Sequence, residues 1–156
     1  AFDEKDLRKK WWVKANTVGS QLYHFPFKYK VRVATVKTEY NVVLRLAEQF
    51  LIRAEASAQM GLLSPALEDL NRIRSRAGLD DTLIADQETL LQAIQEERRV
   101  ELFAEWGHRW LDLKRTGTIH SRLGAIKNNW APYKSLYPIP QSELLLNPFL
   151  AQNPGY

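Results

Sequence analysis

The stretch RLAEQFLIRAEASAQMGLLSPALEDLNRIRSRAG, residues 45–78, decides the fold class of this chain. Apolar residues recur three or four positions apart on both sides of Gly61, which is the periodicity of an amphipathic helix. A glycine there suits the left-handed conformation in which many helices end, and Ser64 followed by Pro65 is typical of a helix start. The pattern predicts two antiparallel helices within residues 39–78.

Working outward toward the C-terminus, the same periodicity predicts two more helices. The first opens near residues 86–89 and ends at Trp106, and a short one covers His108–Arg115. Periodicity then fades, so residues 118–137 are expected to form a loop. Prolines at 138, 140, 148 and 154 exclude a long helix from the tail, which is expected to be extended and to wrap the helices.

Toward the N-terminus the sequence is aromatic and basic. Residues 1–37 hold nine lysines or arginines and three acidic residues, a net charge of +6. Residues 23–37 alternate apolar and polar side chains and predict an edge strand or irregular arm, because Pro26 lacks a backbone donor. A short helical turn is expected at residues 6–14. The cations follow no single helix face and accompany no nucleic-acid-binding motif, so a nucleic-acid partner is not expected.

Length and composition restrict the classes of protein to which this chain can belong. The 156 residues, 45% of them hydrophobic and 26% charged, suit one globular domain. The absence of cysteine excludes disulfides and thiolate chemistry, and no apolar run reaches the roughly 18–20 residues that a membrane-spanning helix needs. The chain begins without methionine or an export signal, and we expect it to be a fragment or a processed product.

No catalytic or metal-binding pattern stands out. The three histidines are scattered, and no phosphate-binding glycine loop, nucleophile elbow or dinucleotide motif occurs, so no metal, cofactor or enzymatic activity is expected. Glu97, Glu101 and Glu105 fall on one helix stripe and could in principle serve glycoside hydrolysis. Nearby cations at helical-neighbour spacing favour ion pairing instead, since they lower carboxyl pKa values. The expected ion-pair network comprises Glu97, Arg98, Glu101, Glu105, Arg109 and Asp112.

Three motifs in order carry a family resemblance. They are residues 45–78, the segment ERRVELFAEWGHRWLDLKRTG at 97–117, and an ending with YPIPQSEL at 137–144 and QNPGY at 152–156. This arrangement resembles the C-terminal part of the SusD/RagB family of nutrient-binding outer-membrane lipoproteins, whose helices are similar to tetratricopeptide repeats. The match covers residues 42–156. Neither a lipid-bearing cysteine nor the family's long N-terminal region is present in this sequence.

The resemblance implies a mostly α fold: one partial domain over residues 1–156, with an aromatic-basic arm (1–38), a helical part (39–117) and a loop and Pro-rich tail (118–156). It implies a surface-exposed protein of the cell outer membrane, lipid-anchored at full length. That protein would bind oligosaccharides without cleaving them and deliver them to a SusC-like TonB-dependent transporter. Aromatic residues outside the helices are the candidate sugar-binding groups: Trp11, Trp12, Trp130 and Tyr133.

Two alternatives remain open from the residues. The second hypothesis is a tetratricopeptide-like scaffold that binds other proteins and has no ligand pocket of its own. A glycoside hydrolase is the third and would require two carboxylates in an open cleft. Within the network, the residues at 97–112 are expected to be architectural and to fix how the helices meet the tail.

Overall fold

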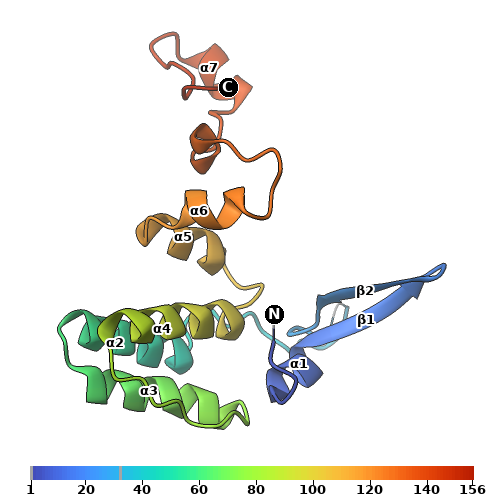
Figure 1. Ribbon diagram of the computed structural model, residues 1–156. Coiled ribbons are helices and arrows are strands. Elements are labelled where there is room, and N and C mark those ends of the chain that lie inside the picture. Colours follow the sequence, from blue (N-terminus) through green and yellow to red (C-terminus); the bar gives the residue numbers. More distant parts are fainter. Residues whose placement is uncertain (1, 32) are drawn as a thin grey trace. The chain divides into compact units, whose positions relative to one another are not determined.

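The computed structural model describes residues 2–31 and 33–156, which form two compact units divided after His108. The first unit contains a short helix, a β-hairpin and three long helices, and the second contains short helices (Figure 1). The elements are α1 (Leu7–Trp12), β1 (Val13–Val18), β2 (Gln21–Pro26), α2 (Leu46–Gln59), α3 (Leu63–Arg76), α4 (Gln87–Glu101), α5 (His108–Arg115), α6 (Ile119–Gly124), the 3₁₀ helix η1 (Pro132–Ser135) and α7 (Gln141–Leu146).

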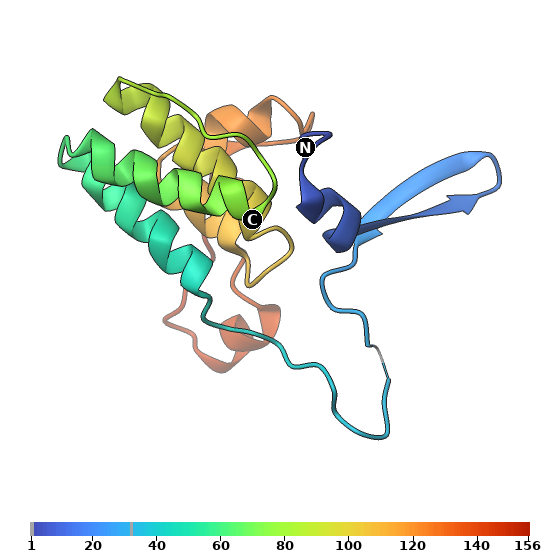
Figure 2. The ribbon, with the colours of Figure 1, turned by 90° about the horizontal axis from the view of Figure 1, so that it is seen from below.

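Helices α2, α3 and α4 pack side by side and enclose the main core (Figures 1 and 2). Leu51, Leu70, Leu90 and Ile94 are almost completely buried there. Small alanines at 54, 58 and 66 are also buried and let the helix backbones approach closely. The expectation of a mostly α fold built on a helical hairpin is confirmed.

The turn between α2 and α3 shows why the hairpin forms here. Gly61 has a φ of +77°, its N–H donates to Ala58 O, and the N–H of Leu62 donates to Ser57 O at 2.9 Å. These bonds satisfy the last carbonyls of α2 in a Schellman arrangement, and Gly78 ends α3 in the same way. Helix α3 begins directly after this turn, at Leu63, so Ser64 lies inside its first turn. The expectation that Ser64 and Pro65 form the start of this helix, with Ser64 as its cap, is therefore wrong.

The first long helix begins at Leu46, seven residues later than the expected residue 39. Distant side chains engage both backbone groups of Val42 in the preceding segment: its N–H donates to Tyr29 Oη at 3.3 Å, and its O accepts from Trp106 Nε1 at 3.1 Å. Backbone groups engaged by distant side chains do not join a helix ladder.

Helix α4 also ends earlier than expected, at Glu101 instead of Trp106. The carbonyl of Glu101 accepts hydrogen bonds from Lys28 Nζ and Arg45 Nη2, both at 2.7 Å. The turn that follows contains left-handed residues, with φ +58° at Ala104, +39° at Trp106 and +73° at Gly107. Left-handed backbone ends a right-handed helix.

The N-terminal segment forms a helix and a hairpin. Asp6 caps α1 by accepting from Arg8 N, and β1 pairs antiparallel with β2 so that Val13 faces Pro26 and Val18 faces Gln21. The expected extended stretch at 23–37 is therefore shorter and earlier, and the strand β1 was not anticipated. In both views the hairpin extends away from the three long helices (Figures 1 and 2).

The second unit has a small core of its own. Leu113 of α5 packs with Ile119 and Leu123 of α6, and Trp110 and Trp130 close over them. The expectation of a loop over 118–137 is wrong, because α6 and η1 lie within it. Ile119 and Leu123 are one helical turn apart, so a single turn suffices to bury both. The tail contains only one short helix, α7, and its wrapping around the other helices stays a prediction.

Candidate functional site

Trp11 and Trp12, two of the expected sugar-binding residues, lie on one face of α1. Trp11 is 55% exposed, whereas Trp12 is partly buried. Together with Leu7, Arg8, Arg76 and Ala77 they surround a hollow of about 290 Å³. We call this the tryptophan hollow. It combines the exposed indole ring of Trp11 with the half-exposed guanidinium group of Arg76, which are partners for the face and the hydroxyls of a sugar. The guanidinium of Arg8 is buried and already bound to carboxylates.

Cations surround both indole rings. Lys28 Nζ lies 4.0 Å from the centroid of the Trp12 ring, and the guanidinium groups of Arg8 and Arg45 lie about 6 Å from it. Lys10 and Lys30 lie 5.3 and 5.5 Å from the Trp11 ring. Cations at these distances are attracted to the ring faces and hold Trp12 in place.

Directly beneath Trp12 is a group of buried ions that we call the charge cluster. Its carboxylates are Glu101, which is 0% exposed, and the nearly buried Glu97 and Glu105. Its cations come from sequence-distant places: α1, the segment after β2, the start of α2 and the end of α3. The members are Asp6, Arg8, Lys28, Arg45, Arg76, Glu97, Glu101 and Glu105.

Glu101 is the centre of the charge cluster. Its Oε2 accepts from Arg8 at 3.0 Å and from Arg76 at 2.6 Å, and its Oε1 accepts from Arg45 at 2.7 Å. Burial acts to raise the pKa of Glu101, but the hydrogen bonds and charges of Arg76 and Arg45 outweigh it and lower that pKa. The carboxylate is therefore ionised and its proton-accepting capacity is used by arginines.

For Glu97 and Lys28, two other members of the charge cluster, burial determines the direction of the pKa shift. Glu97 accepts from Arg8 Nη1 at 2.5 Å, yet burial raises its pKa above the ordinary value despite that arginine. Lys28 pairs with Glu105 at 2.5 Å, and burial lowers the lysine pKa despite the carboxylate. The cluster is thus held together by compensating charges at a desolvation cost, which is typical of an architectural ion-pair network.

The remaining members of the network expected from the sequence lie elsewhere. Arg98 Nη2 approaches Glu48 of α2 at 3.8 Å, and Asp112 pairs with Arg115 at 2.8 Å, one turn further along α5. Arg109 begins the second unit. Sequence reasoning did not find Arg8, Lys28, Arg45 or Arg76 as partners, because they lie between 25 and 93 residues from Glu101 or Glu105 and leave no local signal.

The other two candidate sugar-binding residues lie in the second unit, among other rings. Trp130 packs edge-to-face on Trp110 with ring centroids 6.3 Å apart, and it closes the small core. Tyr133 packs edge-to-face on Tyr156 at 5.1 Å. Their rings thus serve packing within this unit, while Trp11 presents more than half of its surface.

The described residues contain neither a metal-ion site nor a membrane-spanning helix. Across residues 2–31 and 33–156, His, Asp and Glu side chains nowhere gather in a group of three that could hold a metal ion. In the same residues, no helix is both long enough and apolar enough to cross a membrane.

An antiparallel helical hairpin packed against a third long helix, with a short aromatic-basic arm attached to it through buried ions, defines a mostly α protein by class. A family model described as the SusD family matches residues 13–156. The chain therefore belongs to the SusD family.

Individual relatives agree. The chain is 35% identical over 138 residues to the SusD-like protein P38 of Formosa agariphila, covering 82% of this chain and 27% of that protein. It is 35% identical over 122 residues to the starch-binding protein SusD of Bacteroides thetaiotaomicron, covering 73% of this chain and 21% of that protein. The chain spans between a fifth and a third of the length of the curated relatives that it matches.

Solved structures give the same assignment. A SusD homologue from Bacteroides thetaiotaomicron superposes with a TM-score of 0.75 at 29% identity, over 96% of this chain and 35% of that one. A SusD-like carbohydrate-binding protein from Bacteroides vulgatus superposes with a TM-score of 0.62 at 27% identity, over 74% of this chain and 25% of that one. The helical fold is therefore that of the SusD superfamily.

Proposed function

We propose that this chain is part of a protein that binds glycans without cleaving them. The observation that carries the proposal is membership of the SusD family, in which relatives are named for starch or carbohydrate binding. By the same resemblance, the protein acts at the surface of the outer membrane, attached by a lipid, and delivers oligosaccharides to a SusC-like TonB-dependent transporter.

Within this chain, the tryptophan hollow is the proposed contact with sugar. The exposed Trp11 ring offers a flat apolar face on which the C–H groups of a pyranose ring stack. Arg76, which is half-exposed and bound to Glu101, has guanidinium N–H groups beside the hollow that suit sugar hydroxyls. Trp130 and Tyr133 are weaker candidates, because their rings pack against Trp110 and Tyr156.

The burial of the charge cluster supports the absence of hydrolysis. A glycoside hydrolase needs two carboxyl groups open to the substrate, one of them available as an acid. Glu97, Glu101 and Glu105 are 6%, 0% and 8% exposed and bind cations. A sugar cannot reach them without displacing Arg8, Lys28 and Arg45.

The experiment is a calorimetric titration of the full-length protein with a panel of polysaccharides and oligosaccharides, repeated with Trp11→Ala and Trp12→Ala. Trp106→Ala is the matched control, since Trp106 is also 55% exposed and lies outside the hollow. Heat with at least one glycan that is lost in Trp11→Ala and kept in Trp106→Ala supports the proposal. Binding that is equal in all variants places the sugar elsewhere.

A second function, a scaffold for other proteins, is favoured by one observation. Leu46 and Ile52 of α2 and Met60 at its C-cap are 71%, 47% and 68% exposed, so the outer surface of the helical hairpin carries exposed apolar side chains. Incomplete helical repeats expose such faces to a neighbour. If no glycan binds while a protein partner protects α2 from hydrogen exchange, the scaffold function replaces glycan binding.

A further inference from the structure

A second and larger cavity lies on the opposite side of α1 from the tryptophan hollow. It measures about 610 Å³ and is bounded by the segment before α1, by the hairpin and by the end of α4. We call it the phenylalanine cavity. Lys9 of α1 lines it, whereas Leu7, Arg8, Trp11 and Trp12 of α1 line the tryptophan hollow, so the helical period separates the two.

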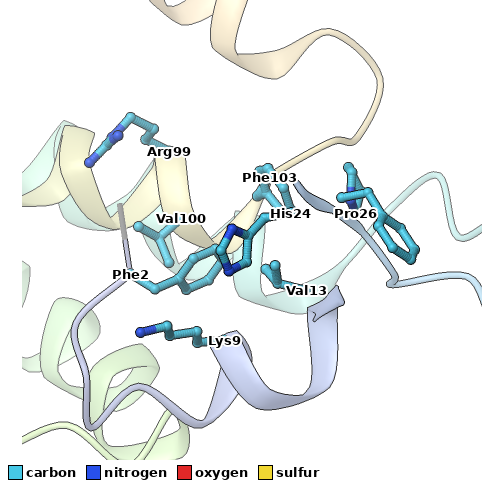
Figure 3. Close-up of a pocket in the computed structure, with 9 residues that line it drawn as sticks. Phe2, Lys9, Val13, His24, Pro26, Arg99, Val100 and Phe103 are labelled. Carbon is cyan, nitrogen blue, oxygen red and sulfur yellow. The ribbon is translucent and has the colours of Figure 1, made fainter. Parts of the chain in front are cut away.

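The wall of the phenylalanine cavity is mainly apolar. Phe2 and Phe103 pack edge-to-face with ring centroids 5.6 Å apart, and Val13 and Val100 lie beside them. Figure 3 shows the rings of Phe2 and His24 at the centre of the lining group. A volume of this size is within the ordinary range of small-molecule sites, and ring faces suit a flat or chair-shaped ligand.

The charged groups of the lining all have one sign. Lys9, His24 and Arg99 are the titratable side chains among the nine lining residues, and none of the nine is an aspartate or glutamate. Arg99 is fixed by Glu96, which accepts from its Nε at 2.6 Å. In Figure 3 the charged ends of Arg99 and Lys9 lie apart from each other, with Val100 and Phe2 between them, on the side of the lining group away from Pro26. The cavity therefore combines an apolar body with separate cations at its edge.

We propose that the phenylalanine cavity binds an anionic sugar unit, a ring that carries a uronate carboxylate or a sulfate ester. Its apolar ring face would pack on Phe2 and Phe103, and its anionic group would meet Lys9. The net charge of +6 on residues 1–37 favours the approach of a polyanionic glycan. This inference rests on the proposed function and adds the chemical class of the glycan and a site separate from Trp11.

The test compares an oligogalacturonate, its methyl ester and a sulfated oligosaccharide as ligands of the full-length protein by calorimetry. The ester has the same rings without the charge. The free acid or the sulfated sugar is expected to bind at least about tenfold more tightly than the ester, the scale of one charge-assisted hydrogen bond. Which of the two anions binds distinguishes uronate from sulfate.

Variants test whether the preference for the anionic ligand arises at the phenylalanine cavity. Lys9→Gln is expected to abolish the preference for the anionic ligand, whereas Lys5→Gln, which removes an exposed lysine four positions earlier, is expected to keep it. Saturation with the anion is also expected to shift the imidazole NMR signals of His24. An unshifted His24, equal binding of acid and ester, or equal effects of the two lysine variants would each overturn the inference.

The experiments give different results if this inference is wrong and if the proposed function is wrong. If neutral glycans bind and only Trp11→Ala weakens them, the glycan-binding function stands and the phenylalanine cavity has no part in it. If no glycan of any charge binds, both are wrong. Circular dichroism of each variant confirms that the helices are intact before binding is compared.

Discussion

The guanidinium of Arg8 and the carboxylate of Glu101 lie 3.0 Å apart, although 93 residues separate them in the sequence. Their side chains are 5% and 0% exposed. Arg8 also binds Glu97 and Asp6. Through these bonds α1, with Trp11 and Trp12 on it, is attached to the end of α4, so the position of the tryptophan hollow depends on the charge cluster.

Replacing Glu101 by glutamine is expected to destabilise the first unit by about 3 kcal/mol, because it leaves buried arginines without a counter-charge. The measurement is the free energy of unfolding in urea. Lys5→Gln is the control, because Lys5 and Asp80 are 75% and 89% exposed, and an exposed pair contributes at most about 1 kcal/mol. Equal losses in the two variants would contradict a central role for Glu101.

Acid is expected to weaken the folded state through the same residue. Since the arginines lower the pKa of Glu101 below its ordinary value of 4.5, the unfolded chain binds that proton more tightly than the folded chain. The stabilisation is complete above about pH 4.5 and is lost as the pH falls through the lowered pKa. Glu97 opposes this trend, because burial raises its pKa and its ionised form costs stability at neutral pH.

The check is the free energy of unfolding between pH 7 and pH 3 in the unmodified protein and in Glu101→Gln. The unmodified protein is expected to lose stability more steeply below pH 4.5, since only it has the Glu101 carboxyl to protonate. Parallel curves would show that other carboxyl groups dominate the acid response.

Replacing the exposed Trp11 is expected to lower glycan affinity, whereas replacing the core-packed Trp130 is expected to lower stability. Trp11→Ala should reduce glycan affinity about tenfold, the scale of a lost stacking contact, with little change in the unfolding temperature. Trp130→Ala should instead cost about 2–3 kcal/mol of stability in the second unit, because its ring covers Leu113, Ile119 and Leu123. Calorimetric titration and thermal unfolding measure the two effects, and the reverse pattern would move the sugar contact to Trp130.

Gly155 is expected to tolerate no side chain. Its φ is +96°, and a Cβ there would come within 2.7 Å of Tyr133 Cδ2. Gly155→Ala should therefore loosen the packing of Tyr133 on Tyr156. Gly117→Ala is the matched control, because Gly117 also has a positive φ, of +69°, but open space around it, so only the backbone cost of about 1 kcal/mol applies.

Near-ultraviolet circular dichroism of the tyrosines and thermal unfolding test this difference. If the clash matters, the excess loss in Gly155→Ala over Gly117→Ala should shrink when Tyr133 is also replaced by alanine. A loss that persists in the double variant would locate the cause in the backbone alone.

Much of the helical architecture could be predicted locally. Helix α5 was expected at its observed bounds and α3 within two residues of its bounds, and Gly61 and Gly78 mark the helix ends, because periodicity and left-handed glycines act through neighbours in the chain. The starts and ends that were wrong, at Leu46 and Glu101, are those where distant side chains bind the backbone.

Only part of the candidate site could be predicted from the sequence. Tryptophans near the N-terminus could be named from the sequence as possible sugar contacts, but their surroundings could not. Whether a ring is exposed, as Trp11 is, or covers a core, as Trp130 does, depends on packing. The phenylalanine cavity joins Phe2, His24 and Phe103, which share no sequence motif.

The sequence by itself therefore determined the family, the helical hairpin and the absence of cysteine chemistry, since each follows from the order and type of neighbouring residues. Only the tertiary structure decided which charges meet Glu101 and which aromatic rings face a cavity. The physical reason is that ion pairing and burial depend on distances in space, and Arg8, Arg45 and Arg76 reach the same carboxylate only once α1, α2, α3 and α4 have packed together.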